Sequence, residues 1–90
     1  LTADKLFLGV DGIHFRYGLT TPNMLEAKVN RLMMNAAAEV VLLADSSKFG
    51  RRSMGVISEI HFVDKIISDT GLPEETRIKL EEMGIIVFTE

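Results

Sequence analysis

Short apolar runs separated by polar, turn-forming residues recur along this chain of 90 residues. The clearest runs are residues 6–10, 40–44 and 85–88, where leucine and β-branched side chains are bounded by turn formers. Two shorter runs of the same kind occupy residues 54–57 and 65–68. Each run has the length of a strand, and continuous apolar runs are typical of strands that are covered on both faces. The pattern therefore predicts several buried strands.

Two segments between these runs have the features of helices. Apolar residues recur at spacings of three and four over residues 22–38, which predicts an amphipathic helix. Thr21 followed by Pro22 gives that helix a hydroxyl cap and a proline at its first position. A second helix is predicted from Pro73 to Gly84, where glycine is a common C-cap. The buried face of the first helix is expected to consist of Leu25, Val29, Leu32, Met33 and Ala36.

Strands and helices alternate in this order, which predicts an α/β fold in which strand, crossover helix and strand form parallel units. Asp11, Asp45 and Asp69 follow three of the predicted strands. The carboxyl ends of parallel strands share one edge of the sheet, so we expect the three carboxylates to lie along it. The start of the first helix, with Thr20 and Thr21, is expected to open toward the same edge and to attract an anion there.

Several residues near this predicted edge have a functional and a structural interpretation, and the sequence leaves both open. The segment 45–48, Asp-Ser-Ser-Lys, could surround a phosphate or carboxylate, or could be a solvated loop. Asp11 with Gly12 could accept hydrogen bonds from sugar hydroxyls, although a turn in which the aspartate caps its own backbone is the simpler interpretation. Glu26 could be an acceptor or a base, or could stabilise the positive end of the helix dipole.

Composition excludes several classes of function. The net charge of −3 argues against a nucleic-acid-binding surface in this segment, because phosphate backbones are met by clustered lysine and arginine. There are no cysteines, hence no disulfides or thiolate metal sites, and His14 and His61 have no metal-binding spacing. We therefore expect no metal and no cofactor. No apolar run approaches the roughly 20 residues of a membrane span, and phosphate-loop and nucleophile-elbow motifs are missing.

With these residues assembled, the chain resembles the C-terminal effector-sensing domain of DeoR-family bacterial transcriptional regulators. The resemblance implies a Rossmann-like, mostly parallel sheet flanked by helices, as in ribose-5-phosphate isomerase A and the coenzyme A transferases. It also implies that residues 1–90 are part of a sensor domain whose first half, like the DNA-binding domain, lies outside these residues. The matching motifs are LGVDGI at 8–13, GLTTP at 18–22 with Glu26-Ala27, VLLADSSKFG at 41–50 and DTGLP at 69–73.

By similarity to the isomerases, Asp11 and Gly12 begin a D-G-A-D loop, Glu26 matches a catalytic glutamate, and Lys48 matches the lysine of a D-x-S-K segment. His14 stands where the second aspartate of that loop would be, which implies a site that binds a phosphorylated sugar without converting it. No catalytic residue is therefore expected. The expected ligand-binding residues are Asp11, Gly12, Thr20, Thr21, Glu26, Asp45, Ser47 and Lys48.

The resemblance further implies a cytoplasmic homo-oligomer, with no membrane association. Operator DNA would be bound by an N-terminal helix-turn-helix outside this segment, and not by the segment itself. Two other functions stay open at this point. One is a sugar-phosphate isomerase-like enzyme, and the other is a plain oligomerisation module whose polar rim is structural.

Overall fold

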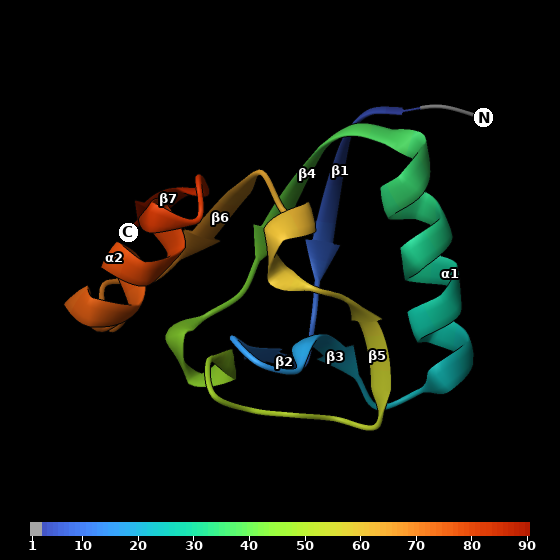
Figure 1. Cartoon of the computed structure of the whole chain (residues 1–90), viewed down its shortest axis with the longest axis horizontal. Coiled ribbons are helices and arrows are strands. Elements are labelled where there is room, and N and C mark those ends of the chain that lie inside the picture. Colours follow the sequence, from blue (N-terminus) through green and yellow to red (C-terminus); the bar gives the residue numbers. More distant parts are fainter. Residues whose placement is uncertain (1–2) are drawn as a thin grey trace.

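The computed structural model describes residues 3–90, which form two small β-sheets, two α-helices and two short 3-10 helices. Figure 1 shows α1 at one end of the molecule and α2 at the other. The strands are β1 (Ala3–Gly9), β2 (Gly12–His14), β3 (Gly18–Thr21), β4 (Ala37–Leu43), β5 (Gly55–Ser58), β6 (Lys65–Ser68) and β7 (Ile86–Thr89). The helices are α1 (Met24–Ala36), α2 (Glu74–Glu82), η1 (Ser46–Lys48) and η2 (Ile60–Phe62).

Four strands form a parallel sheet in the order β1-β4-β6-β7. One row of residues crosses all four strands: Leu8 is level with Leu42, Leu42 with Ile66, and Ile66 with Val87. These strands correspond to the predicted runs 6–10, 40–44, 65–68 and 85–88, so the α/β class and the parallel sheet are confirmed.

The second sheet is antiparallel, with the order β2-β3-β5, and the sequence did not predict its hairpin. Residues 54–57 were predicted as a strand, and they lie in this second sheet rather than beside the parallel strands. Gly18 begins β3 with a φ of 81°, a backbone conformation that favours glycine. A Cβ at Gly18 would also lie 2.2 Å from the carbonyl oxygen of Ser58, so β3 and β5 pack at a distance that only glycine permits there.

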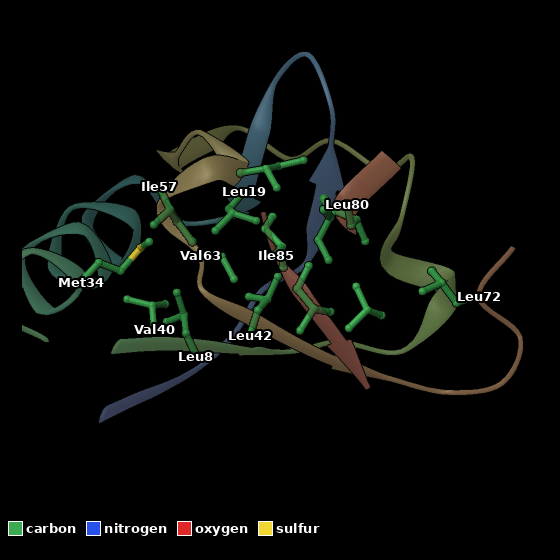
Figure 2. Close-up of a cluster of buried hydrophobic side chains, with 14 of the residues drawn as sticks. Leu8, Leu19, Met34, Val40, Leu42, Ile57, Val63, Leu72, Leu80 and Ile85 are labelled. Carbon is green, nitrogen blue, oxygen red and sulfur yellow. The ribbon is translucent and has the colours of Figure 1, made fainter. Parts of the chain in front are cut away.

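The hydrophobic core lies between the two sheets. Figure 2 shows the labelled core side chains gathered on one side of the parallel sheet. Complete burial of a leucine or isoleucine side chain contributes roughly 1.5–3 kcal/mol, so this layer is the main stabilising feature of the fold. The large apolar side chains that are at least 98% buried there are Ile13, Leu19, Leu42, Ile57, Ile60, Ile66, Leu80 and Ile85.

The opposite face of the parallel sheet is mainly apolar, with the ion-paired Lys5, Glu39 and Lys65 on the same face, and no described element covers it. Val41, at the centre of that face, is 3% exposed, whereas the apolar side chains around it are between 37% and 57% exposed. Parallel sheets are normally covered on both faces, and that expectation is not met within residues 3–90. The exposed side chains of this outer sheet face are Phe7, Leu43, Ile67, Ile86 and Phe88.

The first helix is confirmed, but the prediction that Thr21 is its cap is wrong. The N-cap is Asn23, whose Oδ1 accepts the backbone N–H groups of Leu25 at 2.8 Å and Glu26 at 3.0 Å. Thr21 instead lies in β3, paired with Gly55 of β5. Thr21 is 4% exposed and stays within the sheet, and the cap hydrogen bonds come from Asn23 instead.

The predicted buried face of α1 is also wrong. Ala27, Asn30 and Met34 are the buried residues of the helix, whereas Leu25 and Leu32 are 71% and 62% exposed. The reason is the close approach of α1 to β5. A Cβ at Gly55 would lie 3.1 Å from the Cβ of Ala27, so the contact selects small side chains rather than large apolar ones.

Arg31 fastens the same side of α1 to β5, which is an edge strand of the antiparallel sheet. Its Nε donates to the carbonyl oxygen of Ile57 at 2.9 Å, and its Nη2 donates to that of Val56 at 2.6 Å. Arg31, which is not among the residues of the predicted buried face, therefore takes part in the packing of the helix.

The second predicted helix is confirmed. It begins at Glu74, directly after Pro73, and ends at Glu82. Gly84 follows with a φ of 86°, as expected for a glycine beyond a helix C-terminus. Leu80 is fully buried and packs α2 against the core. The helix connects β6 to β7, which pair in parallel.

Candidate functional site

The polar candidates follow the carboxyl ends of three neighbouring parallel strands. Asp11 comes two residues after β1, Asp45 two residues after β4, and Asp69 directly after β6. The sequence predicted this shared edge, and the sheet order β1-β4-β6 confirms it. A shallow hollow of about 390 Å³ lies at the edge, and we call it the edge hollow. Its lining consists of Val10, Leu43, Ala44, Asp45, Lys48, Ile67, Ser68 and Asp69.

Two carboxylates shape the loop that carries Lys48. Asp45 caps η1, because its Oδ1 accepts the backbone N–H of Ser47 at 2.9 Å and also the Ser47 hydroxyl. Asp69 reaches across from the end of β6, with Oδ2 accepting the backbone N–H of Ser46 at 2.8 Å and Oδ1 that of Gly71 at 2.8 Å. The two loops are therefore joined through Asp69.

These hydrogen bonds lower the pKa of both carboxyls. For Asp45 the main cause is the hydroxyl of Ser47, followed by the backbone N–H of the same residue. For Asp69 the main cause is the backbone N–H of Ser46. Each carboxyl is thus held in its charged form, which is a weak proton acceptor.

Lys48 ends η1 and contributes the cationic group of the edge hollow. Its charge lowers the pKa of Asp11 and of Asp45, so it lies close to both carboxylates. Within residues 3–90, however, no carboxylate oxygen comes within the 4.0 Å of an ion pair with the Lys48 ammonium. The ammonium is therefore available to an anion in the edge hollow.

Asp11 holds a different segment in place. Its Oδ2 accepts the hydroxyl of Ser53 at 2.6 Å and lies 3.9 Å from Nη2 of Arg51. The backbone N–H of Ser53 in turn donates to Oγ1 of Thr20 at 2.9 Å. The pKa of Asp11 is lowered, chiefly by the Ser53 hydroxyl and further by Arg51 and Lys48, while partial burial acts in the opposite direction.

Gly12 allows that segment to lie against β2. A Cβ at this position would be 2.5 Å from the carbonyl oxygen of Arg51 and 2.7 Å from Oγ1 of Thr20. Real side chains do not tolerate such distances, so the glycine is needed for packing. The structure thus places Gly12 under the 50–53 segment and not in the lining of the edge hollow.

Three expected site residues lie away from the edge hollow. Thr20 and Thr21 are 0% and 4% exposed within β3, because the unpredicted β2–β3 hairpin separates β1 from α1. The expectation that they open toward the sheet edge at the helix start is therefore wrong. Glu26 is exposed in the first turn of α1 and does not contribute to the lining of the edge hollow.

Other expected residues come together as predicted. Asp45 and Lys48 line the edge hollow, and Ser47 supports Asp45 from the exposed side of the loop. Sequence reasoning placed the Asp69 carboxylate along the shared edge but did not include Asp69 among the expected ligand-binding residues. The available signal was its position directly after an apolar strand.

Two kinds of feature are absent from the part of the chain that the structure describes. Residues 3–90 contain no cluster of three or more histidine, aspartate or glutamate side chains that could hold a metal ion. Over the same residues, no helix has the length and apolar character that crossing a bilayer requires. His14 instead closes the β2–β3 turn, where its Nδ1 accepts the backbone N–H of Arg16 at 3.0 Å.

A known protein family matches most of the chain. A family described as the DeoR C terminal sensor domain matches residues 1–70. This range includes Asp11, Asp45, Lys48 and Asp69, and therefore all the strand ends that surround the edge hollow.

Known proteins with similar sequences are transcriptional regulators by name. The chain is 43% identical over 84 residues to the HTH-type transcriptional regulator GlpR of Haloferax volcanii, covering 93% of this chain and 33% of that protein. It is 40% identical over 85 residues to a putative aga operon transcriptional repressor of Escherichia coli O157:H7, covering 94% and 32%. The chain thus spans about a third of the length of these relatives.

Proposed function

This chain belongs to the DeoR C-terminal sensor domain family, and from that premise we propose that it is the effector-binding part of a DNA-binding transcriptional repressor that senses a phosphorylated sugar or sugar derivative. The relatives named above are regulators, and one of them is a repressor by name. The observation that carries the proposal is that Lys48 lines the edge hollow beside Asp45 and Asp69 while no carboxylate of residues 3–90 forms an ion pair with its ammonium.

The chemistry of the edge hollow suits such a ligand. A phosphate group carries negative charge and strong acceptor oxygens, and the Lys48 ammonium supplies three donors. Sugar hydroxyls donate hydrogen bonds, and the carboxylates of Asp45 and Asp69 are charged acceptors on the same lining. In this proposal Asp11, Gly12, Thr20 and Thr21 do not contact the ligand, and the first three hold the 50–53 segment in place.

Binding without conversion is the better interpretation of these carboxylates. A general base for sugar isomerisation needs a pKa near the working pH. Asp11, Asp45 and Asp69 all have a lowered pKa, and Glu26 lies outside the lining of the edge hollow. This favours a sensor over an isomerase-like enzyme. A plain oligomerisation module would not explain why Lys48, Asp45 and Asp69 line one hollow while no carboxylate of residues 3–90 forms an ion pair with the lysine.

We further propose that the chain is one part of a longer, cytoplasmic homo-oligomer. The support is that it spans about a third of its relatives, and that two apolar surfaces, the outer sheet face and one side of α1, have no cover within residues 3–90. The rest of the regulator would contain a helix-turn-helix that binds operator DNA and the first half of the sensor. The complete sensor would have the fold of ribose-5-phosphate isomerase A and the coenzyme A transferases.

The mechanism that follows is linkage between ligand and DNA. A ligand shifts a conformational equilibrium only by the difference between its affinities for the two states. A sugar phosphate that joins the loops after β4 and β6 would favour one sensor conformation. In a symmetric oligomer, that conformation would set the spacing of paired DNA-binding domains.

The test is calorimetric titration of the intact regulator with hexose and pentose monophosphates, using Lys48→Met and, as a matched control, Lys28→Met. Lys28 is an exposed lysine on α1, outside the lining of the edge hollow. We expect Lys48→Met to weaken binding at least tenfold, which is about 1.4 kcal/mol, and Lys28→Met to leave it unchanged. Equal affinities for the two variants would remove Lys48 from the site and would overturn the proposal.

A further inference from the structure

Apolar side chains form a row along the outward side of α1. Leu25, Val29 and Leu32 are 71%, 46% and 62% exposed, and Ala36 is partly exposed. The periodicity of the helix places these four residues on one line, opposite the side of α1 that packs against β5. Figure 1 shows both sheets on the same side of α1, so this line lies on the outside of the molecule. We call these four residues the outer seam.

The spacing within the outer seam indicates that its partner is a helix. The four residues follow one another at intervals of four, three and four along the sequence, which is the a/d repeat of a coiled coil. A helix that packs on a sheet has a wider apolar stripe. The outer seam is bordered on one side by Lys28 and Asn35 and on the other by Glu26 and Met33. The exposed row is therefore about one helix wide.

We propose that the outer seam is a contact between two copies of this chain, in which the two α1 helices pair antiparallel about a two-fold axis. The axis passes between Val29 and Leu32. Each Val29 then lies against Leu32 of the second copy, and each Leu25 lies against Ala36. A larger side chain meets a smaller one in every layer, as close packing requires. A parallel pair would set Ala36 against Ala36 and leave a void in that layer, which is destabilising.

The residues that border the outer seam suit this arrangement. Across an antiparallel pair, Glu26 would lie beside Met33 of the second copy, and Lys28 beside Asn35. No two like charges meet, and the dipole of each helix opposes that of its neighbour. A contact that uses the same surface on both copies closes to a dimer. The inference rests on the homo-oligomer of the proposed function, and it is independent of what the edge hollow binds.

The test is disulfide cross-linking in the intact regulator, with Leu25→Cys and Ala36→Cys made in separate copies. Residues 1–90 contain no cysteine, and any cysteine elsewhere in the regulator is replaced by serine. Under mild oxidation we expect a covalent dimer when the two variants are mixed and none when either is oxidised alone, because a disulfide requires neighbouring Cβ atoms. A covalent dimer of Leu25→Cys alone would show a parallel pair. That result, or a mixture without a covalent dimer, overturns the proposal.

Leu32→Glu measures the same contact in the absence of a cross-link, and Ile78→Glu is its matched control. Ile78 is an apolar residue of α2 that is 47% exposed, away from the outer seam. Sedimentation equilibrium should show that Leu32→Glu raises the dissociation constant between copies about tenfold or more, because an unpaired charge would be buried between the helices. Ile78→Glu should leave the constant unchanged.

Equal dissociation constants for Leu32→Glu and Ile78→Glu would overturn the contact between the outer seams. If the wild-type regulator is monomeric, the homo-oligomer of the proposed function fails and the inference fails with it. Effector binding is measured separately, by the titration with sugar phosphates described above.

Discussion

Asp69 accepts the backbone N–H of Ser46 at 2.8 Å, and this hydrogen bond fastens the loop after β4 to the loop after β6. Lys48 ends the short helix that begins at Ser46. The position of the lysine in the edge hollow therefore depends on a carboxylate that lies more than twenty residues away in the sequence. Preorganisation of this kind reduces the cost of ordering side chains when a ligand binds.

Removal of the Asp69 carboxylate should affect both stability and binding. Asp69→Ala leaves the N–H groups of Ser46 and Gly71 without their acceptor, so we expect a lower denaturation midpoint and weaker sugar-phosphate binding. Asp64→Ala is the matched control, because Oδ2 of Asp64 also accepts a backbone N–H, that of Val40 at 2.8 Å, away from the edge hollow. Asp64→Ala should lower the denaturation midpoint and leave the affinity for the sugar phosphate unchanged. An Asp69→Ala variant that binds sugar phosphate as tightly as wild type would contradict the proposed role of the loop that carries Lys48.

Substitution of Gly12 should be costly. In Gly12→Ala, the new Cβ would overlap the carbonyl oxygen of Arg51 at 2.5 Å, and overpacking of this kind costs about 1–3 kcal/mol. The neighbouring Gly9→Ala is the control, since its Cβ would meet nothing closer than 4.0 Å. Chemical denaturation measures the free energy of unfolding of Gly12→Ala and Gly9→Ala. If the two variants are equally stable, the 50–53 segment does not lie against Gly12 as described.

The N-cap of α1 gives a third prediction. Asn23→Ala removes the acceptor of two N–H groups, so the free energy of unfolding should fall by about 1 kcal/mol. Asn35→Ala, at an exposed position within the same helix, should be neutral or slightly stabilising because alanine has the higher helix propensity. Urea denaturation distinguishes this result from the alternative in which Thr21 caps the helix, where Asn23→Ala would have no effect.

Acid should destabilise the fold through its three strand-end carboxyls. The pKa values of Asp11, Asp45 and Asp69 are lowered in the folded state from the ordinary value of 3.8. The unfolded chain therefore binds protons at a higher pH than the folded chain does. The stabilisation is complete above the unfolded pKa and is lost as the pH falls through the lower folded values.

Urea denaturation from about pH 5 down to about pH 2 measures this dependence. We expect a steadily falling free energy of unfolding, with a shallower fall in Asp69→Asn, because asparagine does not titrate. A profile of the asparagine variant that is parallel to that of wild type would show that Asp69 has no lowered pKa.

The parallel sheet could be predicted because its strands carry a strong local signal. Residues 40–44 are apolar without interruption, and Asp45 marks the end of β4 clearly. The shared edge of Asp11, Asp45 and Asp69 could also be predicted, because parallel strands place their carboxyl ends together. By contrast, the β2–β3 hairpin has only Ile13 and Leu19 as large buried apolar residues, and two short strands of this kind give almost no periodicity.

The orientation of α1 could not be read from its sequence for a physical reason. Hydrophobic periodicity identifies an apolar stripe but not what the stripe contacts. In α1 the stripe that contains Leu25 and Leu32 is exposed, while the close approach of Gly55 selects Ala27 on the packed side.

The position of Arg31 has a consequence for how this molecule behaves among copies of itself. An open edge of a sheet offers unpaired carbonyl groups onto which a strand of another molecule can add. On β5 the guanidinium already occupies the carbonyl oxygens of Val56 and Ile57. One arginine on a neighbouring helix thus leaves β5 with fewer free carbonyl groups for a strand of another molecule to pair with.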